Sequence, residues 1–449
     1  MRIRSVYIDG FRRFKAQTIH LEKDSTVIAG ANNSGKTSLI DLFRVVLGDE
    51  ASFRADDLCI ENRIQWIQVV IESAIAGEEN FHRTIEDEEV LRTVPSIEVK
   101  LEVTYDPQKD DIREFADYLM DLDTKKNAFY FKYVFAPNPE KFLDLTRELY
   151  PFIEKAVKKH NWESYEDSAQ SSTEFLAIQT AIDDALVRSS EAKAYFADED
   201  YLNVIPMESP KSLSKLFNFH AVKASRALDD TSEDKSGGLN KRLISVAKQD
   251  KNWDSKLAEF PGIVIDAIAN TGIRELTTEE TLKSLNEVID SISQTNGTAQ
   301  SDLFVDFQMT EELATHVISR SMQTRYMDGG AALGEASQGL GYSNLIYLHL
   351  EAESFIRAAS APEGEFLVNL LVMEEPESHM HPQMQNAFIR HFFERVDGAL
   401  NVQALVTTHS SEIIRSSKIT QLRVLKVEYG NARVVDLRDF HERNVRDSG

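Results

Sequence analysis

The feature that most constrains the fold of this chain is a glycine-containing octapeptide near its N-terminus, Gly30-Ala-Asn-Asn-Ser-Gly-Lys-Thr37. It fits the pattern GxxxxGK[ST] in full, after a predicted strand at 25–28 and before a helix predicted from Lys36. Gly30 and Gly35 let the loop wrap, so that backbone N–H groups point inward at phosphate oxygens. A chance glycine-rich turn is the alternative, but it explains neither the full pattern nor the context. The octapeptide therefore predicts a phosphate-binding loop.

The side chains of this loop have the chemistry needed to hold a nucleoside triphosphate and its metal ion. Lys36 supplies a positive charge to the β- and γ-phosphates, and the Thr37 hydroxyl is a ligand for Mg²⁺. ATP and Mg²⁺ are therefore the predicted cofactors. The other ATP-binding candidates of the loop are Gly30, Asn32, Asn33, Ser34, Gly35 and Ser38.

A second group of candidates, Glu374 and Glu375, follows the apolar run FLVNLLVM at 366–373. Such a run is typical of a strand buried on both faces, and ligands bind at the carboxyl ends of strands in parallel α/β sheets. We expect Glu374 to hold Mg²⁺ and Glu375 to orient or deprotonate the attacking water. Adjacent acids repel each other, so they need a cation beside them. The alternative is a solvated acidic strand end.

A third candidate is His409, which follows a short apolar strand predicted at 404–406. A histidine at the end of a neighbouring core strand can reach a γ-phosphate and sense its loss. An isolated histidine is more often a helix cap or a packed residue. The position of His409, one helix and one strand after Glu375, favours the phosphate-sensing role.

A fourth candidate is the loop that contains Ser337, Gly339 and Gly341, which precedes a predicted helix. Free N–H groups at the start of a helix form an anion site. A flexible loop is the alternative.

The pattern along the chain predicts an α/β nucleotide-binding domain in two lobes, residues 1–105 and 311–449. Strict alternation predicts a strand at 97–105, and Gly430-Asn431 between two apolar runs predicts a hairpin. The polar segment between residue 50 and the strand at 97–105, which contains four acids at 86–89, is expected to be a loop on the sheet.

Residues 106–310 are predicted to be a mostly helical insertion between the lobes, because helical spacing recurs at 174–187 and 281–292. The predicted fold class is therefore α/β: a mixed sheet with flanking helices, interrupted by this insertion.

Composition bears on partners and compartment. The formal net charge of −24 counts against direct binding to nucleic acid, which draws on Lys and Arg, although it is also explained by solubility alone. Contact with DNA is therefore expected to be indirect. The chain has no apolar run long enough for a membrane span and no secretory signal. Cys59 is the only cysteine, so no internal disulfide is possible. We expect a cytoplasmic protein without a membrane partner.

The order of these motifs resembles that of the ABC-type ATPases of the SMC/RecF group. In that reading, the Walker A loop is Gly30–Thr37, the signature-like loop is Ser337–Gly341, Walker B ends at Glu375, and His409 is the switch. The chain looks most like the ATPase module of the overcoming-lysogenisation-defect (OLD) nucleases and their anti-phage relatives such as Gabija. The phrases that carry this likeness are FRRF at 11–14, LVMEEPESHMHPQ at 371–383 and LVTTHSSEII at 405–414.

The resemblance implies a homodimer or higher homo-oligomer. ATP would lie between the Walker A loop of one copy and Ser337 and Gly339 of another, with the insertion as the dimerisation region. The implied function is an ATPase that gates an effector, a Toprim nuclease, in anti-phage defence. The alternative is a RecF- or SMC-like DNA-repair or chromosome-maintenance ATPase that binds DNA directly.

The sequence departs from the family pattern in three respects. Residue 374 is Glu, where most ABC proteins have Asp. Gln65 and Gln68 are candidates for the Q-loop, but they also suit ordinary strand or surface positions. The acidic constellation of a Toprim domain is missing, so no nuclease site is expected in this chain. The nuclease would then lie beyond residue 449 or in a separate protein, as in the PARIS and Septu systems.

Several charged residues carry weaker predictions. His379 and His381 suggest a metal site, but a structural role at a subunit contact is the favoured interpretation. Two interpretations are open for Arg12 and Arg13: they approach the phosphates, or they are solvated charges. Arg226 is a candidate for tying the insertion to the core.

Overall fold

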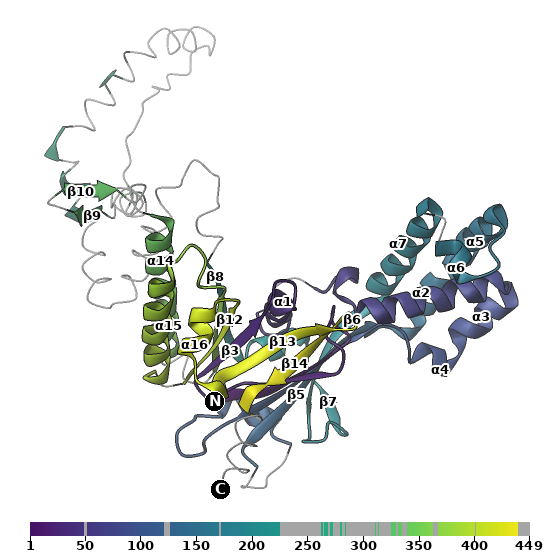
Figure 1. The fold of residues 1–449 in the computed structure, drawn as a ribbon, viewed down its shortest axis with the longest axis horizontal. Coiled ribbons are helices and arrows are strands. Elements are labelled where there is room, and N and C mark those ends of the chain that lie inside the picture. Colours follow the sequence, from purple (N-terminus) through teal and green to yellow (C-terminus); the bar gives the residue numbers. More distant parts are fainter. Residues whose placement is uncertain are drawn as a thin grey trace, which may run out of the picture. The chain divides into compact units, whose positions relative to one another are not determined.

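The structure is a computed structural model that describes residues 1–48, 52–120, 126–169, 172–224, 339–361, 367–399 and 401–438, with short segments between 262 and 334. The chain divides into two compact units (Figure 1). The first contains Met1–Ser225 and Phe355–Gly449, and the second contains Arg226–Ser354. The fold is α/β, with a mixed sheet and flanking helices, as predicted.

One six-stranded sheet of the first unit has the strand order β14-β13-β3-β12-β11-β8. All neighbours in it are parallel except β13 and β14, which form the predicted hairpin. Every residue of β11 and β12 is buried, as expected for apolar runs between covered faces. The strands are β3 (Ser25–Gly30), β8 (Phe217–Lys223), β11 (Val368–Glu374), β12 (Val402–Thr408), β13 (Leu422–Glu428) and β14 (Asn431–Asp436).

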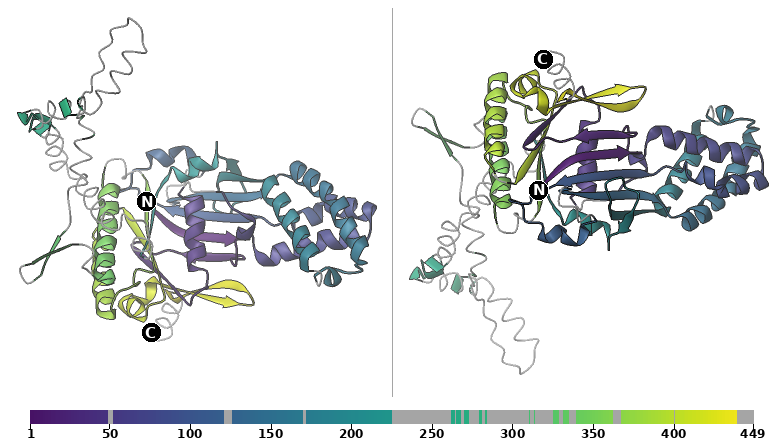
Figure 2. Two further views of the ribbon diagram at one scale, coloured as in Figure 1. Left: turned by 90° about the horizontal axis from the view of Figure 1, so that it is seen from above. Right: turned by 90° about the horizontal axis from the view of Figure 1, so that it is seen from below.

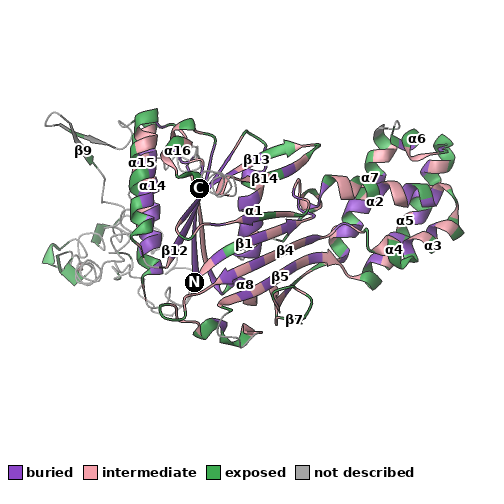
Figure 3. Ribbon diagram, turned by 60° about the horizontal axis from the view of Figure 1, so that its bottom comes forward, coloured by how far each residue is buried: buried purple, intermediate pink, exposed green. Residues whose placement is uncertain are grey.

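The other six-stranded sheet is antiparallel, with the order β2-β1-β4-β5-β6-β7. Buried positions alternate along β4, which confirms the strand predicted from strict alternation (Figure 3). The strands are β1 (Arg2–Asp9), β2 (Gln17–His20), β4 (Ile97–Thr104), β5 (Ala128–Pro137), β6 (Ser190–Ala197) and β7 (Val204–Pro206).

Helices pack against the parallel sheet. α1 (Lys36–Val46) contacts β3, β8 and β11, and its apolar stripe joins one core with the buried residues of β1 and β4. α15 (Pro382–Asp397) packs against β3 and β12, and the short α16 (Ser411–Ser416) packs against α15. The predicted helix after Gly339 is α14 (Leu340–Ala359).

A group of helices lies at one end of the antiparallel sheet (Figure 2). The long α5 contacts α2, α3 and α7. The helices are α2 (Ile60–Ile75), α3 (Glu78–Glu86), α4 (Glu88–Leu91), α5 (Pro139–His160), α6 (Tyr165–Ala169) and α7 (Ser172–Ser189), and α8 (Pro210–Ser214) follows β7. Among the described residues, no helix is both long and apolar enough to cross a bilayer.

The segment between residues 50 and 97 was predicted to be a loop, but it contains α2, α3 and α4. Its acids at 86–89 lie at the junction of α3 and α4. Asp87 caps α4 by accepting hydrogen bonds from the backbone N–H groups of Glu89 and Val90. Acidic side chains favour the start of a helix, because they satisfy its free N–H groups and its dipole. The same acidity that indicated a loop therefore stabilises a helix start.

The predicted insertion at 106–310 also differs from the structure in its first part. Residues 106–224 include β5, β6, β7 and β8, and they belong to the first unit. The helix predicted at 174–187 is α7, whereas the one at 281–292 lies almost wholly outside the described residues. In the second unit, β9 (Arg325–Asp328) and β10 (Ala331–Gly334) form an antiparallel pair.

Candidate active site

The loop between β3 and α1 wraps around the amino group of Lys36. Lys36 Nζ donates hydrogen bonds to the carbonyls of Gly30 (2.8 Å) and Ala31 (3.0 Å), and the residue is only 4% exposed. Gly35 has a φ of 107°, and a Cβ there would lie 3.3 Å from the buried Phe14 ring. A Cβ at Gly30 would come within 2.8 Å of the Leu425 backbone carbonyl oxygen. Both glycines are therefore required by the path of the loop.

The carboxylate of Glu374 meets the start of α1. Thr37 Oγ1 donates a hydrogen bond to Glu374 Oε1 over 3.0 Å, and the Glu374 side chain is almost fully buried. On the other side, Lys223 Nζ lies 3.6 Å from the same oxygen, because β8 pairs with β11 in a register that sets Lys223 opposite Glu374. Lys223 is thus the cation that this buried carboxylate needs.

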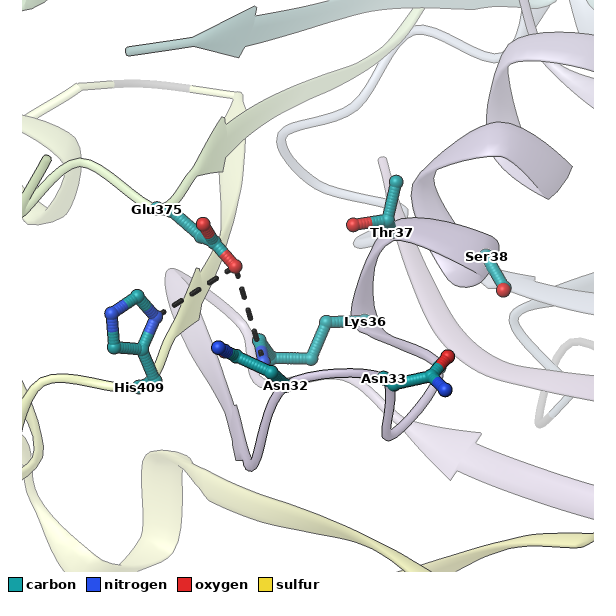
Figure 4. A pocket seen from close by; sticks show the side chains of 8 residues that line it. Asn32, Asn33, Lys36, Thr37, Ser38, Glu375 and His409 are labelled. Atoms are coloured by element: carbon teal, nitrogen blue, oxygen red, sulfur yellow. Dashed lines mark ion pairs between the residues drawn. The ribbon is translucent and has the colours of Figure 1, made fainter. Parts of the chain in front are cut away.

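Glu375 turns away from the buried strand and faces the loop. Its φ of 47° lies in the left-handed region, which costs free energy for a residue with a side chain. Its Oε1 lies 4.0 Å from Lys36 Nζ and 3.7 Å from His409 Nδ1 (Figure 4). The strained turn thus places the Glu375 carboxylate near both the Lys36 amino group and the His409 ring.

These side chains surround a polar cavity of about 380 Å³. This volume falls in the usual range of ligand sites. The residues that line it are Asn32, Asn33, Gly35, Lys36, Thr37, Ser38, Glu375 and His409. The structure therefore brings together most of the predicted loop residues, the predicted base and the predicted switch.

The donor set fits a magnesium-bound triphosphate. The hydroxyl of Thr37 and the carboxylate of Glu374 are adjacent oxygen ligands of the kind that Mg²⁺ prefers. Ser34 Oγ is buried and has no hydrogen-bond partner among the residues that the structure describes. Lys36 and the free N–H groups at the start of α1 supply the positive end that phosphate requires.

Arg12 contacts α1 through Asp41 and Ser38. Its guanidinium pairs with Asp41 (2.8 Å) and Asp57 (2.9 Å) and lies 3.3 Å from Ser38 Oγ. Burial lowers the pKa of Arg12, but the two carboxylates outweigh that effect and leave the pKa above its ordinary value. Arg12 is therefore engaged in ion pairs with protein carboxylates, and the half-buried Arg13 does not line the cavity.

Other predicted residues lie elsewhere or outside the description. Gly339 and Gly341 flank the first residue of α14 in the second unit, whereas Ser337 and Arg226 lie outside the described residues. Gln65 is exposed on α2, and Gln68 on the same helix donates a hydrogen bond to Glu72. Both glutamines thus occupy surface positions of a helix.

The two histidines after Glu375 are exposed. His381 caps α15, where its Nδ1 accepts a hydrogen bond from the Gln383 backbone over 3.4 Å. In the described part of the chain, no three His, Cys, Asp or Glu side chains cluster in a way that would hold a metal ion.

Two residues of the site were missed in the sequence. Lys223 ends β8, and its signal would have been a cation at the end of a core strand, but β8 lay inside the predicted insertion. Glu377 is a buried acid beside the His409 loop. In the sequence Glu377 stands close to two other acids, Glu374 and Glu375, and only those two were predicted to have a role.

Comparison with known proteins identifies relatives that match most of the chain. A family profile described as an AAA ATPase domain matches residues 1–414. The endonuclease GajA of Bacillus cereus (strain HuB5-5) is 24% identical over 427 residues, which cover 89% of this chain and 53% of GajA. The chain thus spans about half the length of that relative.

Two solved structures resemble the fold more distantly. The SMC head domain of Thermotoga maritima gives a TM-score of 0.41 at 12% identity, covering 97% of this chain and 99% of that one. The Smc head domain of Pyrococcus furiosus with an extended coiled coil, bound to the C-terminal domain of ScpA, gives 0.43 at 10% identity, covering 100% of both. At TM-scores this low, the two structures give no information on the function of this chain.

Proposed function

The chain belongs to the AAA ATPase domain family, and we propose that it binds Mg²⁺·ATP in the cavity between its phosphate-binding loop, Glu375 and His409 and hydrolyses it there. The observation that supports this most is the convergence of Lys36, Thr37, Glu374, Glu375 and His409, which come from three segments of the chain. No single segment of the sequence contains this set, so the fold has to assemble it.

Each side chain then has one task. Lys36 exchanges its contacts with the loop carbonyls for contacts with phosphate oxygens. Glu375 accepts a proton from the attacking water at its carboxylate, which faces the cavity. His409 contacts the γ-phosphate from the end of β12. Thr37 and Glu374 would hold Mg²⁺, which supplies neutralisation of the developing phosphate charge.

We further propose that the site is completed by a second copy of the chain. All eight residues that line the cavity belong to the loop or to α1, or directly follow β11 or β12. The resemblance to ABC-type ATPases supports a closed homodimer or higher homo-oligomer, in which Ser337, Gly339 and Gly341 of another copy face the nucleotide. Hydrolysis would release this closed state by removing the γ-phosphate.

The effector in this proposal is a nuclease that the ATPase gates in anti-phage defence. It is supported by the likeness to GajA, a relative named an endonuclease, of which the chain covers about half. The nuclease would act either in a further part of the protein or as a separate partner. DNA would then be reached through the effector, consistent with the net charge of −24.

The experiment is a comparison of ATP hydrolysis by the purified chain with and without double-stranded DNA. Hydrolysis that is unchanged by DNA at physiological salt supports the gating proposal. Strong stimulation by DNA at that salt would instead favour the direct DNA-binding ATPase of the RecF or SMC kind. A chain without hydrolysis under either condition contradicts the proposed activity.

A further inference from the structure

We propose that Glu377 is a positioning residue, which fixes the His409 loop against the turn that carries Glu375. The inference deepens the proposed function, since it concerns the same site. Glu377 lies at the third position after Glu374 and is 6% exposed. It does not line the cavity, so any effect on hydrolysis must pass through another residue.

A single oxygen of Glu377 accepts several hydrogen bonds from the loop that follows β12. Its Oε1 accepts hydrogen bonds from Thr408 Oγ1 (2.7 Å), the His409 backbone N–H (2.8 Å) and the Ser410 backbone N–H (3.2 Å). The His409 ring nitrogen Nδ1 lies 3.4 Å from the same oxygen. Three consecutive residues are thus held by one carboxylate oxygen, and charge-assisted hydrogen bonds of this kind are the strong ones.

The other oxygen of Glu377 shows that packing does not explain the residue. Glu377 Oε2 is buried and has no hydrogen-bond partner among the described residues. Burying a carboxylate with half of its acceptors unused costs free energy. Stability alone does not favour such a residue, whereas a requirement to fix the His409 loop does.

The turn after β11 links Glu377 rigidly to the predicted base. The Ser378 backbone N–H and hydroxyl both donate to the Glu375 carbonyl, at 3.1 Å and 2.9 Å. The Met380 backbone N–H donates to the Glu377 carbonyl over 3.0 Å. Since Glu375 and Glu377 belong to one hydrogen-bonded turn, a loop fixed to Glu377 has a fixed distance to Glu375.

The far side of the His409 loop is also anchored. Ser410 caps α16, and its hydroxyl donates to Gln385 Oε1 over 2.6 Å. Between that anchor and β12, Glu377 is the side chain that binds the backbone of His409 itself. Its removal should therefore move His409 relative to Glu375 and leave the strand and helix in place.

The first test is hydrogen–deuterium exchange, which does not depend on hydrolysis. In Glu377→Ala we expect the His409 amide to exchange about tenfold faster or more, because the charge-assisted hydrogen bond that protects it is lost. The Ser410 amide should change less, because it also donates to Thr408 Oγ1 over 2.9 Å. Glu377→Gln keeps an acceptor oxygen at the same place and should retain most of the protection. Unchanged exchange in Glu377→Ala overturns the proposal, whether or not the protein hydrolyses ATP.

The second test is steady-state ATP hydrolysis. For Glu377→Ala we expect kcat to fall up to about 100-fold with little change in KM, because the error lies in positioning and not in binding. Glu377→Gln should recover most of kcat. Glu412→Ala, an acid of α16 that pairs with Arg415, is the matched control and should behave as wild type.

A double-mutant cycle with His409→Ala separates positioning from a direct role. If Glu377 acts through His409, the double variant Glu377→Ala/His409→Ala should be no slower than His409→Ala. If the double variant instead loses kcat by the product of the two single losses, the proposal is overturned. A Glu377→Gln variant with a kcat as low as that of Glu377→Ala would also overturn it. If Glu377→Ala does not fold, Glu377→Gln enters the same cycle, and multiplied losses there count equally against the proposal.

Discussion

Thr37 Oγ1 donates a hydrogen bond to Glu374 Oε1 over 3.0 Å, although the two residues stand near opposite ends of the chain. The contact joins the first residues of α1 to the end of β11, and it places a hydroxyl beside a buried carboxylate. In the proposed site these two side chains would hold the phosphate-bound Mg²⁺.

Replacing Lys36 should weaken ATP binding. In the proposed site the buried Lys36 faces the phosphates, so Lys36→Ala should raise the Kd for ATP by about tenfold or more, equivalent to about 1.4 kcal/mol. Calorimetric titration with ATP measures this, and Lys193→Ala, an exposed lysine of β6, is the control. Wild-type affinity in folded Lys36→Ala would contradict the assignment.

Replacing Glu375 should separate binding from hydrolysis. Glu375→Gln keeps the shape of the side chain and loses the base, so kcat should fall by about 10² to 10⁴ while ATP still binds. Phosphate release and ATP titration on the same protein measure the two properties. Hydrolysis at the wild-type rate would refute Glu375 as the base.

Lys223 should stabilise the protein mainly when no metal is bound. Lys223→Met leaves the buried Glu374 carboxylate without its facing cation, so unfolding without nucleotide should become easier by about 1 kcal/mol after allowance for solvent screening. Saturating Mg²⁺·ATP should reduce the difference in stability between Lys223→Met and the wild type, since the metal replaces the missing charge.

Thermal unfolding with and without Mg²⁺·ATP tests the Lys223 prediction. Lys193→Met, an exposed lysine that is 3.9 Å from Glu191, is the control. An equal loss of stability in both conditions would show that Lys223 does not compensate Glu374.

A composite site should allow two inactive variants to rescue each other. A Cβ at Gly339 would meet no atom within 4 Å in the described part of the chain, so Gly339→Asp adds a carboxylate without a clash. It should repel the triphosphate held by another copy. Mixed with Lys36→Ala, it leaves one intact site in each mixed dimer, so hydrolysis should return to about a quarter of the wild-type rate. A mixture that stays inactive after subunit exchange argues against shared sites.

The sequence predicted the strands and the helix that carry the candidate residues better than it predicted the elements between them. The loop at Gly30–Thr37, the strand before Glu374 and the strand before His409 each combine a complete local pattern with a hydrophobic run, so β3, β11, β12 and α1 were all found. The carboxyl ends of parallel strands meet at one edge, which is why residues from separate segments converge.

The missed elements have signals that depend on their tertiary partners. β5 alternates in burial, but helical stretches flank it, and its pairing with β4 and β6 is not visible in its own residues. The acids at 86–89 suit a loop and a helix start equally well. Glu377 is indistinguishable from its acidic neighbours in the sequence, and only the path of the His409 loop shows what it binds.

The central claim is that Lys36, Glu374, Glu375 and His409 surround one triphosphate. A crystal structure of Glu375→Gln with Mg²⁺ and ATP tests it most directly. We predict the γ-phosphate between Lys36 Nζ and the His409 ring, with the metal against Thr37 and Glu374. A nucleotide bound elsewhere, with Lys36 still on the carbonyls of Gly30 and Ala31, would contradict the account.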